Sequence, residues 1–355
     1  MGVYTTIDKP SDHFLAKTYT GTHSSVPTVT VGFKSDWLWL KSRTQTYDHA
    51  VFDTSRGGTK YLGTQDSSTE NTSGDSVTFN ATTFQPSGQA INEAGQGADN
   101  MISWNWKCNG GTTSTNTDGA TNGENTTVQA NQTAGFSIVQ WDAPFNQGNG
   151  RYNLGHGLGK IPDFIIIKNR EASGNWYVHH PNIDDNDYLM LDSNAATSNT
   201  SARYTFYRPD FTTTLFNVDY NNIVTQNEAY IAYVFATIQG YSKFDSWTGN
   251  GSTDGPFIYT GFKPAWLMIK RIDSSNNWYI FDNARDSYQN PIADMMEANS
   301  NVVENANTAR GDFLSNGFKI RSSANAFNAN NGVYIYAAFA ENPFVSSTGV
   351  PTTAK

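Results

Sequence analysis

The sequence predicts an all-β protein built from three tandem antiparallel β-sandwich units of the jelly-roll type. Three observations predict this fold class. Glu, which favours helix interiors, is scarce, whereas aromatic residues, which suit pleated sheets, make up 14% of the 355 residues. One hydrophobic strand that ends in Lys occurs three times. Each copy then ends in an alternating aromatic strand at nearly the same distance from that Lys, so one structural unit is repeated along the chain.

The repeated strand has the sequences WLWLK at residues 37–41, FIIIK at 164–168 and WLMIK at 266–270. Each copy follows a turn that contains Gly, and strands of four to eight residues separated by Asn-Gly and Asp-Gly signals surround it. Short strands at this spacing are typical of an antiparallel sandwich. Residues 290–303 form the one stretch that allows a helix, and only weakly.

The repeat register divides the chain into three units and their connections. The first connection is long and rich in Gly, Thr and Asn, so it predicts a flexible joint, whereas the short second connection at residues 239–242 predicts a stiff one. The predicted segments are an N-terminal strap at 1–18, units at 19–108, 136–238 and 243–343, a polar linker at 109–135 and a C-terminal tail at 344–355.

Charge and cysteine content exclude several classes of partner. The net charge of −9 disfavours binding to nucleic-acid phosphates and to anionic bilayers. No apolar stretch approaches the ~20 residues of a membrane-spanning helix, and the first residues lack the features of a signal peptide. Cys108 is the single cysteine, so the fold must hold without an intrachain disulfide. We therefore expect no nucleic acid, no membrane insertion and no cofactor.

Residue patterns for catalysis and metal binding are weak. Glycoside hydrolysis needs two carboxyl groups held close together, yet no Glu lies within four residues of another or two residues from an Asp. Asp184 to Asp187 (DDND) offers oxygen ligands for Ca²⁺ but lacks the Gly and the distal Glu of a calcium loop, so a solvated acidic turn is the favoured interpretation. We expect a protein without enzymatic activity.

The repeated strands supply the candidate contact residues. On an alternating strand Trp266, Met268 and Lys270 face one way and Leu267 and Ile269 the other, so both faces are apolar up to the Lys. One face is expected to form the sandwich core, and the other to contact a neighbouring unit, another subunit or the ring of a sugar. Core packing is the favoured interpretation for the tryptophans. The candidate glycan or interface contacts are Trp37, Trp39, Lys41, Lys168, Trp176, Trp266, Lys270 and Trp278.

A second repeated element follows twelve residues after the Lys in the first and third copies. The pairs Asp53–Arg56 and Asp282–Arg285 are predicted to be ion pairs that stabilise a turn, while the second copy has His180 at the same offset and no Arg. A charge pair offered to a ligand is the less favoured interpretation, because the pair is missing from one copy.

Three segments of the third copy carry a resemblance to a known family. Residues 240–244 (GYSKF), 248–257 (TGNGSTDGPF) and 339–344 (FAENPF) resemble a repeat family that is encoded by bacteriophages of marine bacteria. The resemblance covers nearly the whole chain and implies tandem concanavalin-like β-sandwich units in a virion-associated protein. It implies no catalytic residues. The first copy departs from the pattern, with Ser35 where the other copies have a turn Pro.

The expected function is that of a non-enzymatic bacteriophage virion structural protein, displayed on the particle surface as a fibre, knob or decoration. Such a chain would assemble in the host cytoplasm with other capsid or tail proteins, as a homo-oligomer, with host surface glycans as a further candidate partner. The chain has no heptads, which favours an accessory over a fibre shaft, with residues 1–17 as the attachment strap. The alternative function is a stand-alone carbohydrate-binding module or adhesin.

Overall fold

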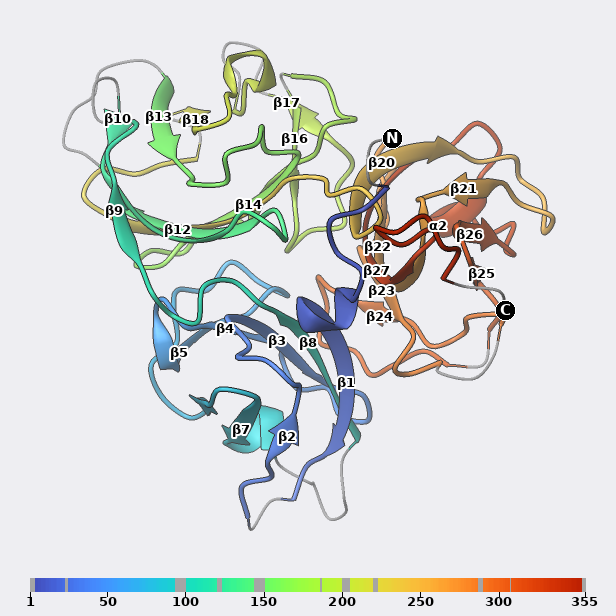
Figure 1. Cartoon of the computed structure of the whole chain (residues 1–355), viewed down its shortest axis with the longest axis horizontal. Coiled ribbons are helices and arrows are strands. Elements are labelled where there is room, and N and C mark those ends of the chain that lie inside the picture. The colour runs from blue at the N-terminus through green and yellow to red at the C-terminus, as the bar shows by residue number, and fades with distance from the viewer. Residues whose placement is uncertain are drawn as a thin grey trace.

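The computed structural model describes residues 4–22, 25–92, 100–119, 123–143, 151–185, 187–199, 205–219, 223–286, 290–306 and 308–352. Strands dominate this part of the chain and its helices are three or four residues long, so the predicted all-β class is confirmed. The strands form three pairs of sheets, seen as three lobes around a common centre in Figure 1. We call the lobes unit 1 (β1 to β8), unit 2 (β9 to β19) and unit 3 (β20 to β27). None of the described helices has the length and hydropathy of a membrane span.

Unit 1 pairs a five-stranded sheet, in the order β1-β8-β3-β4-β5, with a three-stranded sheet, in the order β2-β7-β6. The five strands of the larger sheet are β1 (Phe14–Thr20), β3 (Trp37–Ser42), β4 (Ala50–Asp53), β5 (Gly57–Leu62) and β8 (Asn100–Trp106). The smaller sheet and the helices are β2 (Val29–Thr30), β6 (Ser76–Phe79), β7 (Thr83–Ser87), η1 (Pro10–Asp12) and α1 (Gln89–Asn92).

Unit 2 has an eight-stranded sheet in the order β17-β16-β15-β14-β19-β12-β11-β9, with a three-stranded sheet β10-β13-β18 that includes one short parallel pair. The large sheet contains β9 (Ser114–Asn116), β11 (Thr126–Asn131), β12 (Phe136–Asp142), β14 (Phe164–Asn169), β15 (Tyr177–His179), β16 (Asp187–Met190), β17 (Ser198–Asn199) and β19 (Ala229–Phe235). The remaining elements are β10 (Gly123–Glu124), β13 (Arg151–Gly155), β18 (Leu215–Asp219) and η2 (Arg208–Asp210).

Unit 3 repeats the five-plus-three arrangement of unit 1, with sheets in the orders β20-β27-β22-β23-β24 and β21-β26-β25. The larger sheet contains β20 (Ser242–Thr248), β22 (Phe262–Arg271), β23 (Tyr279–Asp282), β24 (Met296–Glu297) and β27 (Val333–Pro343). The remaining elements are β21 (Phe257–Tyr259), β25 (Gly311–Leu314), β26 (Gly317–Ile320) and α2 (Asn325–Asn328).

The three large sheets share one strand order around the repeated Lys strand. In each unit the closing aromatic strand lies between the opening strand and the Lys strand, as β8 lies between β1 and β3. The pairing register also corresponds, because the last aromatic of each closing strand pairs with the first residue of the repeated five-residue sequence. These pairs are Trp37 with Trp106, Phe164 with Phe235 and Trp266 with Phe339.

Each Lys strand contributes to two different cores, because successive side chains point to opposite faces. Leu267 and Ile269 lie in the core between the two sheets of unit 3, whereas Trp266 and Met268 lie in a core shared by all three units. The other two Lys strands divide their residues in the same way. The large sheets therefore face one another across the shared core, and the three smaller sheets lie on the outside (Figure 1).

The segment predicted as a polar linker, residues 109–135, contains the strands β9, β10 and β11, and residues 127–131 of β11 pair with β12. A strand that fills its backbone hydrogen bonds on a neighbour needs few apolar side chains, and here Val128 supplies one to the core of unit 2. The predicted flexible joint is also not a free chain, since the backbone N–H groups of Cys108 and Gly110 both donate to Asp36 Oδ2, at 2.6 and 2.9 Å.

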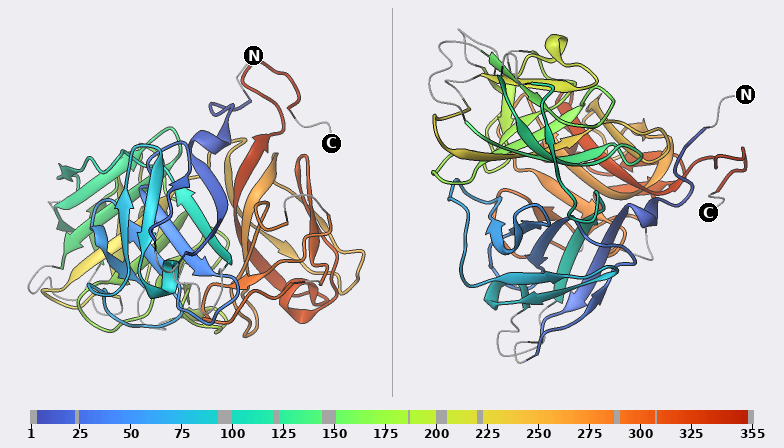
Figure 2. Two further views of the ribbon diagram at one scale, coloured as in Figure 1. Left: turned by 90° about the horizontal axis from the view of Figure 1, so that it is seen from below. Right: turned by 60° about the vertical axis from the view of Figure 1, so that its left-hand side comes forward.

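The predicted N-terminal strap at 1–18 is largely part of the body, because Phe14–Thr20 forms the edge strand β1. Ile7 and Phe14 are buried in the shared core, so residues 7–17 are not a free attachment arm. Figure 2 shows the N-terminal segment and the C-terminal tail on the same side of the molecule, where Ser347 N donates to Asp8 Oδ1 at 2.6 Å.

The helix allowed by residues 290–303 does not form. This stretch contains the short strand β24, and Met295 exchanges backbone hydrogen bonds with Asn305. The tertiary structure decides against a helix here, because Met295 and Met296 bury their side chains in two different cores, unit 3's own and the shared one.

Candidate functional site

The five tryptophans predicted as glycan or interface contacts lie in the shared core. Trp37, Trp39, Trp176, Trp266 and Trp278 are at most 3% exposed, so none offers a ring face on which a sugar could stack. The interpretation of these side chains as buried packing residues agrees with the structure. Trp37, Trp176, Trp266 and Trp278 each contact a residue of another unit, so they join the units instead of filling the individual sandwiches. Trp39 contacts His49 and Trp104 of its own unit.

The centre of the shared core is a cluster of aromatic rings from all three units. Trp37 of unit 1 stacks on Tyr233 of unit 2, with ring centroids 4.7 Å apart. Trp106 of unit 1 meets Trp266 of unit 3 edge to face at 5.5 Å, and Phe235 of unit 2 meets Phe339 of unit 3 at 5.7 Å. Aromatic pairs of this geometry contribute about 0.5–1.5 kcal/mol each beyond the area that they bury. The cluster thus links every unit to both others.

One ring nitrogen in each unit donates a hydrogen bond to the backbone of the next unit. These donors occupy the same position, eight residues after the repeated Lys. Unit 2 donates to unit 1, unit 3 to unit 2 and unit 1 to unit 3, so the three contacts form a closed circle. They are Trp176 Nε1 to the Gly63 carbonyl at 2.7 Å, Trp278 Nε1 to the Met190 carbonyl at 2.9 Å, and His49 Nε2 to the Glu297 carbonyl at 3.0 Å.

The three repeated lysines are buried beside these hydrogen bonds between the units. Lys41, Lys168 and Lys270 are at most 1% exposed, and each Nζ donates only to backbone carbonyls. Lys168 reaches the Ser67 carbonyl of unit 1 and Lys270 the Asn194 carbonyl of unit 2, both at 3.3 Å. Because burial disfavours the charged form, the pKa of Lys41 and of Lys168 falls to about 8 and that of Lys270 to about 7.

The Asp53–Arg56 pair stabilises its turn, as predicted, and also joins units 1 and 2. Arg56 Nε donates to Asp53 Oδ2 at 2.5 Å, and both side chains are fully buried. The Tyr233 hydroxyl of unit 2 donates to the same carboxylate oxygen at 2.9 Å. Glu70 accepts from Arg56 at 3.2 Å and from Arg170 of unit 2 at 3.0 Å. We call these five residues the first clamp.

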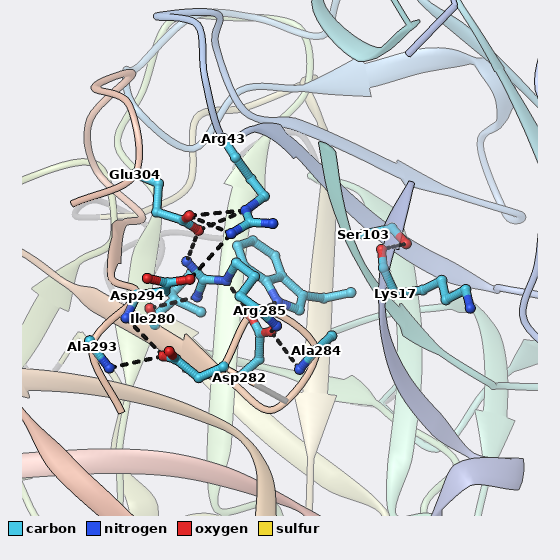
Figure 3. A network of polar contacts seen from close by, with 12 residues as sticks. Lys17, Arg43, Ser103, Ile280, Asp282, Ala284, Arg285, Ala293, Asp294 and Glu304 are labelled. Atoms are coloured by element: carbon cyan, nitrogen blue, oxygen red, sulfur yellow. Dashed lines mark hydrogen bonds and ion pairs between the residues drawn. The ribbon is translucent and has the colours of Figure 1, made fainter. Parts of the chain in front are cut away.

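The Asp282–Arg285 pair forms a matching second clamp between units 3 and 1 (Figure 3). Arg285 Nε donates to Asp282 Oδ2 at 2.6 Å, and Trp104 Nε1 of unit 1 donates to that oxygen at 2.9 Å. Glu304 accepts from Arg285 at 3.0 Å and from Arg43 of unit 1 at 2.6 Å. Both carboxylates of the clamp are thus bound by an arginine of the protein. The clamp is therefore a structural contact and offers no free charge pair to a ligand.

The third junction, between units 2 and 3, keeps the same backbone contact without the charges. His180 stands where the other units have Asp, and its Nε2 bonds to the Tyr336 carbonyl of unit 3 at 3.1 Å. Thr197 N donates to the Ile272 carbonyl at 3.0 Å. The equivalent bonds, Glu70 N to Arg170 O at 2.9 Å and Glu304 N to Arg43 O at 3.0 Å, join the clamped units.

Four residues of the clamps were not predicted from the sequence: Glu70, Arg170, Arg43 and Glu304. A signal for two of them exists, because Arg43 and Arg170 both lie two residues after the repeated Lys. No local pattern marks their glutamate partners, which lie far away in the sequence and reach the arginines only through the packing of the units.

The remaining candidates for chemistry are isolated. Asp184 and Asp185 are exposed, and among the described residues no group of three or more His, Cys, Asp or Glu side chains could hold a metal ion. Cys108 is buried, and burial raises the pKa of its thiol, which disfavours the reactive thiolate. His179 is buried against Phe206 and Phe211 in unit 2.

Two hollows on the surface of the described structure have the volume of a small-molecule site. One, of about 450 Å³, lies between the N-terminal segment and unit 2 and is lined by residues such as Thr5, Gln132 and Lys160. The other, of about 330 Å³, lies between units 1 and 3 and is lined by Tyr47, Asp48 and Asn301 among others. The second combines aromatic, carboxylate and amide groups, and it is the better candidate for a ligand site.

The fold and the buried contacts define a class: single-chain β-sandwich proteins whose paired sheets are held around one shared core. Within it, the chain belongs to the family described as a domain of unknown function (DUF7483), whose model matches residues 9–343. The matched range includes the large sheets of all three units, so the family corresponds to the whole assembly and not to one repeat. No curated protein and no solved structure matches the chain.

Proposed function

We propose that this chain is a non-enzymatic structural protein of a bacteriophage virion, displayed on the particle surface as a fibre, knob or decoration. The observation that carries the proposal is the use of the repeated residues. The Trp, Lys and Asp–Arg positions shared between copies, where a repeated active site would be sought, are buried in contacts between units. They join the three units through buried contacts, which suits a protein exposed on a particle surface.

The resemblance of the third copy to phage-encoded repeats supports the same proposal, and so does the net charge of −9, which disfavours nucleic acid as a partner. The partners proposed here are other capsid or tail proteins, with assembly in the host cytoplasm. Virion proteins occur in symmetric arrays, so several copies of this chain would be present in each particle.

A carbohydrate-binding module or adhesin that acts on its own is the second candidate. The hollow of about 330 Å³ between units 1 and 3, which we call the groove, favours it. Its lining combines phenol rings with carboxylates and an amide. The two candidates differ in where the protein resides, so its location separates them.

The test is to purify particles on a density gradient from a lysate of the phage-infected host and to quantify this chain by mass spectrometry. We expect it at a fixed ratio to the major capsid protein, with gold-labelled antibody against the chain on intact particles. If the chain is abundant in the lysate but absent from the particle band, the virion proposal is wrong and the stand-alone module is favoured.

A further inference from the structure

The groove between units 1 and 3 is built from side chains that the shared core does not use. Tyr47 and Asp48 come from the loop after β3, Tyr61 from β5, and Asn301 from the loop after β24 of unit 3. Its volume of about 330 Å³ lies at the lower end of the range of small-molecule pockets, about 300–1,000 Å³. The groove therefore suits one small ring better than an extended chain.

His49 holds the loop that carries Tyr47 and Asp48. Its Nδ1 accepts a hydrogen bond from Trp39 Nε1 at 2.8 Å, so Nε2 carries the proton and donates to the carbonyls of Glu297 and Ser300 at 3.0 and 3.1 Å. Burial lowers the pKa of His49 to about 3, which keeps the ring neutral and this pattern of bonds intact. The two sides of the groove are thus fixed to each other before a ligand arrives.

The polar groups of the groove are arranged for hydroxyl donors. Asn301 Nδ2 donates to Asp48 Oδ1 at 3.3 Å, which places a carboxylate and an amide side by side across the junction of the units. Asp75, a buried residue of the lining, accepts from the Ala90 N–H at 3.0 Å through Oδ1. Ionised carboxylates accept hydrogen bonds at both oxygens and can bind two neighbouring hydroxyl groups of one ligand.

The aromatic residues add an apolar surface to the same groove. Tyr47 and Tyr61 are partly exposed, and Tyr61 is supported from behind by Phe52, with ring centroids 5.3 Å apart. Burial and the carboxylates of Asp75 and Asp48 raise the pKa of Tyr61, so its phenol stays protonated and can both donate and accept. Partly exposed aromatic rings beside hydroxyl-binding carboxylates match a pyranose, which has an apolar C–H face and a polar rim.

The charge of the groove selects among sugars. Its lining includes the carboxylates of Asp48 and Asp75, and no Lys or Arg side chain is among the described residues that form it. A ligand with its own negative charge, such as a sialylated or phosphorylated sugar, would be repelled, because like charges in a partly desolvated site are unfavourable.

The groove also departs from the repeat. At the position of Tyr47 units 2 and 3 have Gly174 and Asn276, and at the position of Asp48 they have Asn. The shared core does not need these two side chains, because the other units form the equivalent junctions without them.

We propose that this groove binds a neutral pyranose of a surface glycan. The proposal adds a ligand class to the surface display proposed above and rests on it for its biological setting. The binding itself, however, can be measured on the isolated chain.

The experiment is saturation-transfer NMR on the full chain with the methyl pyranosides of glucose, galactose, mannose and N-acetylglucosamine, and with 3′-sialyllactose as an anionic probe. We expect transfer to at least one neutral pyranoside, with affinity about tenfold lower in Tyr47→Ala and in Asp48→Asn, as expected when one ring contact or one charged acceptor is lost. The matched controls Tyr259→Ala and Asp254→Asn alter an exposed tyrosine and an exposed aspartate elsewhere on unit 3 and should bind as wild type.

The proposal is overturned if no neutral pyranoside binds, if sialyllactose is preferred, or if the groove variants bind as well as wild type while their melting temperatures are unchanged. Titration with CaCl₂ alone tests the competing case of a cation site. The proposal is also overturned if Ca²⁺ binds without sugar, if Asp48→Asn abolishes that binding and if no pyranoside binds. Particle-bound protein without sugar binding refutes this inference alone, whereas sugar binding by a protein that particles lack refutes the virion proposal.

Discussion

Three equivalent lysines lie buried at the junctions of the units, where no carboxylate receives an Nζ hydrogen bond. Their Nζ groups donate only to backbone carbonyls, and burial lowers the pKa values of Lys41 and Lys168 to about 8 and that of Lys270 to about 7, from an ordinary value of 10.5. Between these values and pH 10.5, the unfolded chain binds more protons than the folded one. Stability should therefore rise with pH in that interval.

We expect the free energy of unfolding to increase from pH 7 to about pH 9, measured by urea denaturation at constant ionic strength. Above that, the Cys108 thiol and the buried tyrosines, whose pKa values burial raises, act in the opposite direction. In Lys270→Met the increase should be smaller, while Lys160→Met, at an exposed lysine, should keep the wild-type slope. Equal slopes in both variants would contradict this account of the buried lysines.

Trp266 gives a second test at the scale of one side chain. Trp266→Ala removes a ring that contacts Trp106, Phe14 and Phe339 in the shared core, and it should lower the free energy of unfolding by about 3–5 kcal/mol. Tyr259→Ala, at a residue 49% exposed, should change it by less than about 1 kcal/mol. The measurement is a urea or thermal melt of each variant, and an unchanged midpoint for Trp266→Ala would overturn its place in the core.

At the scale of elements, the two clamps show how a turn motif becomes a contact between units. Asp-x-x-Arg closes the turn after β4 and after β23, which the sequence pattern predicts. The same carboxylates then accept hydrogen bonds from Tyr233 on β19 and Trp104 on β8, which belong to other units. The local part was predictable because its partners are three residues apart, whereas the long-range part depends on how the sheets face one another.

The second clamp predicts a large effect for one cation. Arg285→Met leaves the buried Asp282 and Glu304 carboxylates without this partner, and removal of one member of a buried ion network costs about 3–5 kcal/mol. Adding Asp282→Asn should recover part of the loss, because Asp282 is the carboxylate left without a cation, whereas Glu304 keeps its bond to Arg43. Lys9→Ala breaks the exposed Lys9–Asp12 pair and should cost no more than about 1 kcal/mol. Urea melts should therefore show the largest loss of stability in Arg285→Met, a smaller loss in the double variant and the smallest in Lys9→Ala.

Two strands were not predicted from the sequence. β11 carries few apolar residues, so composition indicated a linker, yet it pairs through backbone hydrogen bonds with β12 and β9 in the large sheet of unit 2. β1, predicted as part of a strap, pairs with β8 at the edge of the large sheet of unit 1. Those bonds form with any side chain, and only the position of the neighbouring strand decides whether they do.

At the scale of the whole molecule, the three units depend on one another. One face of each large sheet packs on the small sheet of its own unit, and the opposite face is covered by the other two units. Separation of the units would therefore expose a contiguous surface rich in Trp and Phe. We therefore expect one cooperative unfolding transition, with calorimetric and van't Hoff enthalpies that agree.

A variant in the private core of one unit makes this expectation specific. Leu267→Ala lies between the two sheets of unit 3 and should lower the midpoint of the single transition. Differential scanning calorimetry is the measurement. A transition that splits, with one part at the wild-type midpoint, would show instead that the units unfold independently.

The sequence by itself determined the β class, the repeated strand, its nearly constant distance along the chain from the closing strand and the turn pairs, because each depends on alternation, on the repeat or on residues close together in the chain. It also indicated correctly that both faces of the Lys strands are buried. Only the tertiary structure decided what covers the second face. An apolar face is satisfied equally by another unit, another subunit or a sugar ring, and the choice made here depends on side chains more than a hundred residues apart.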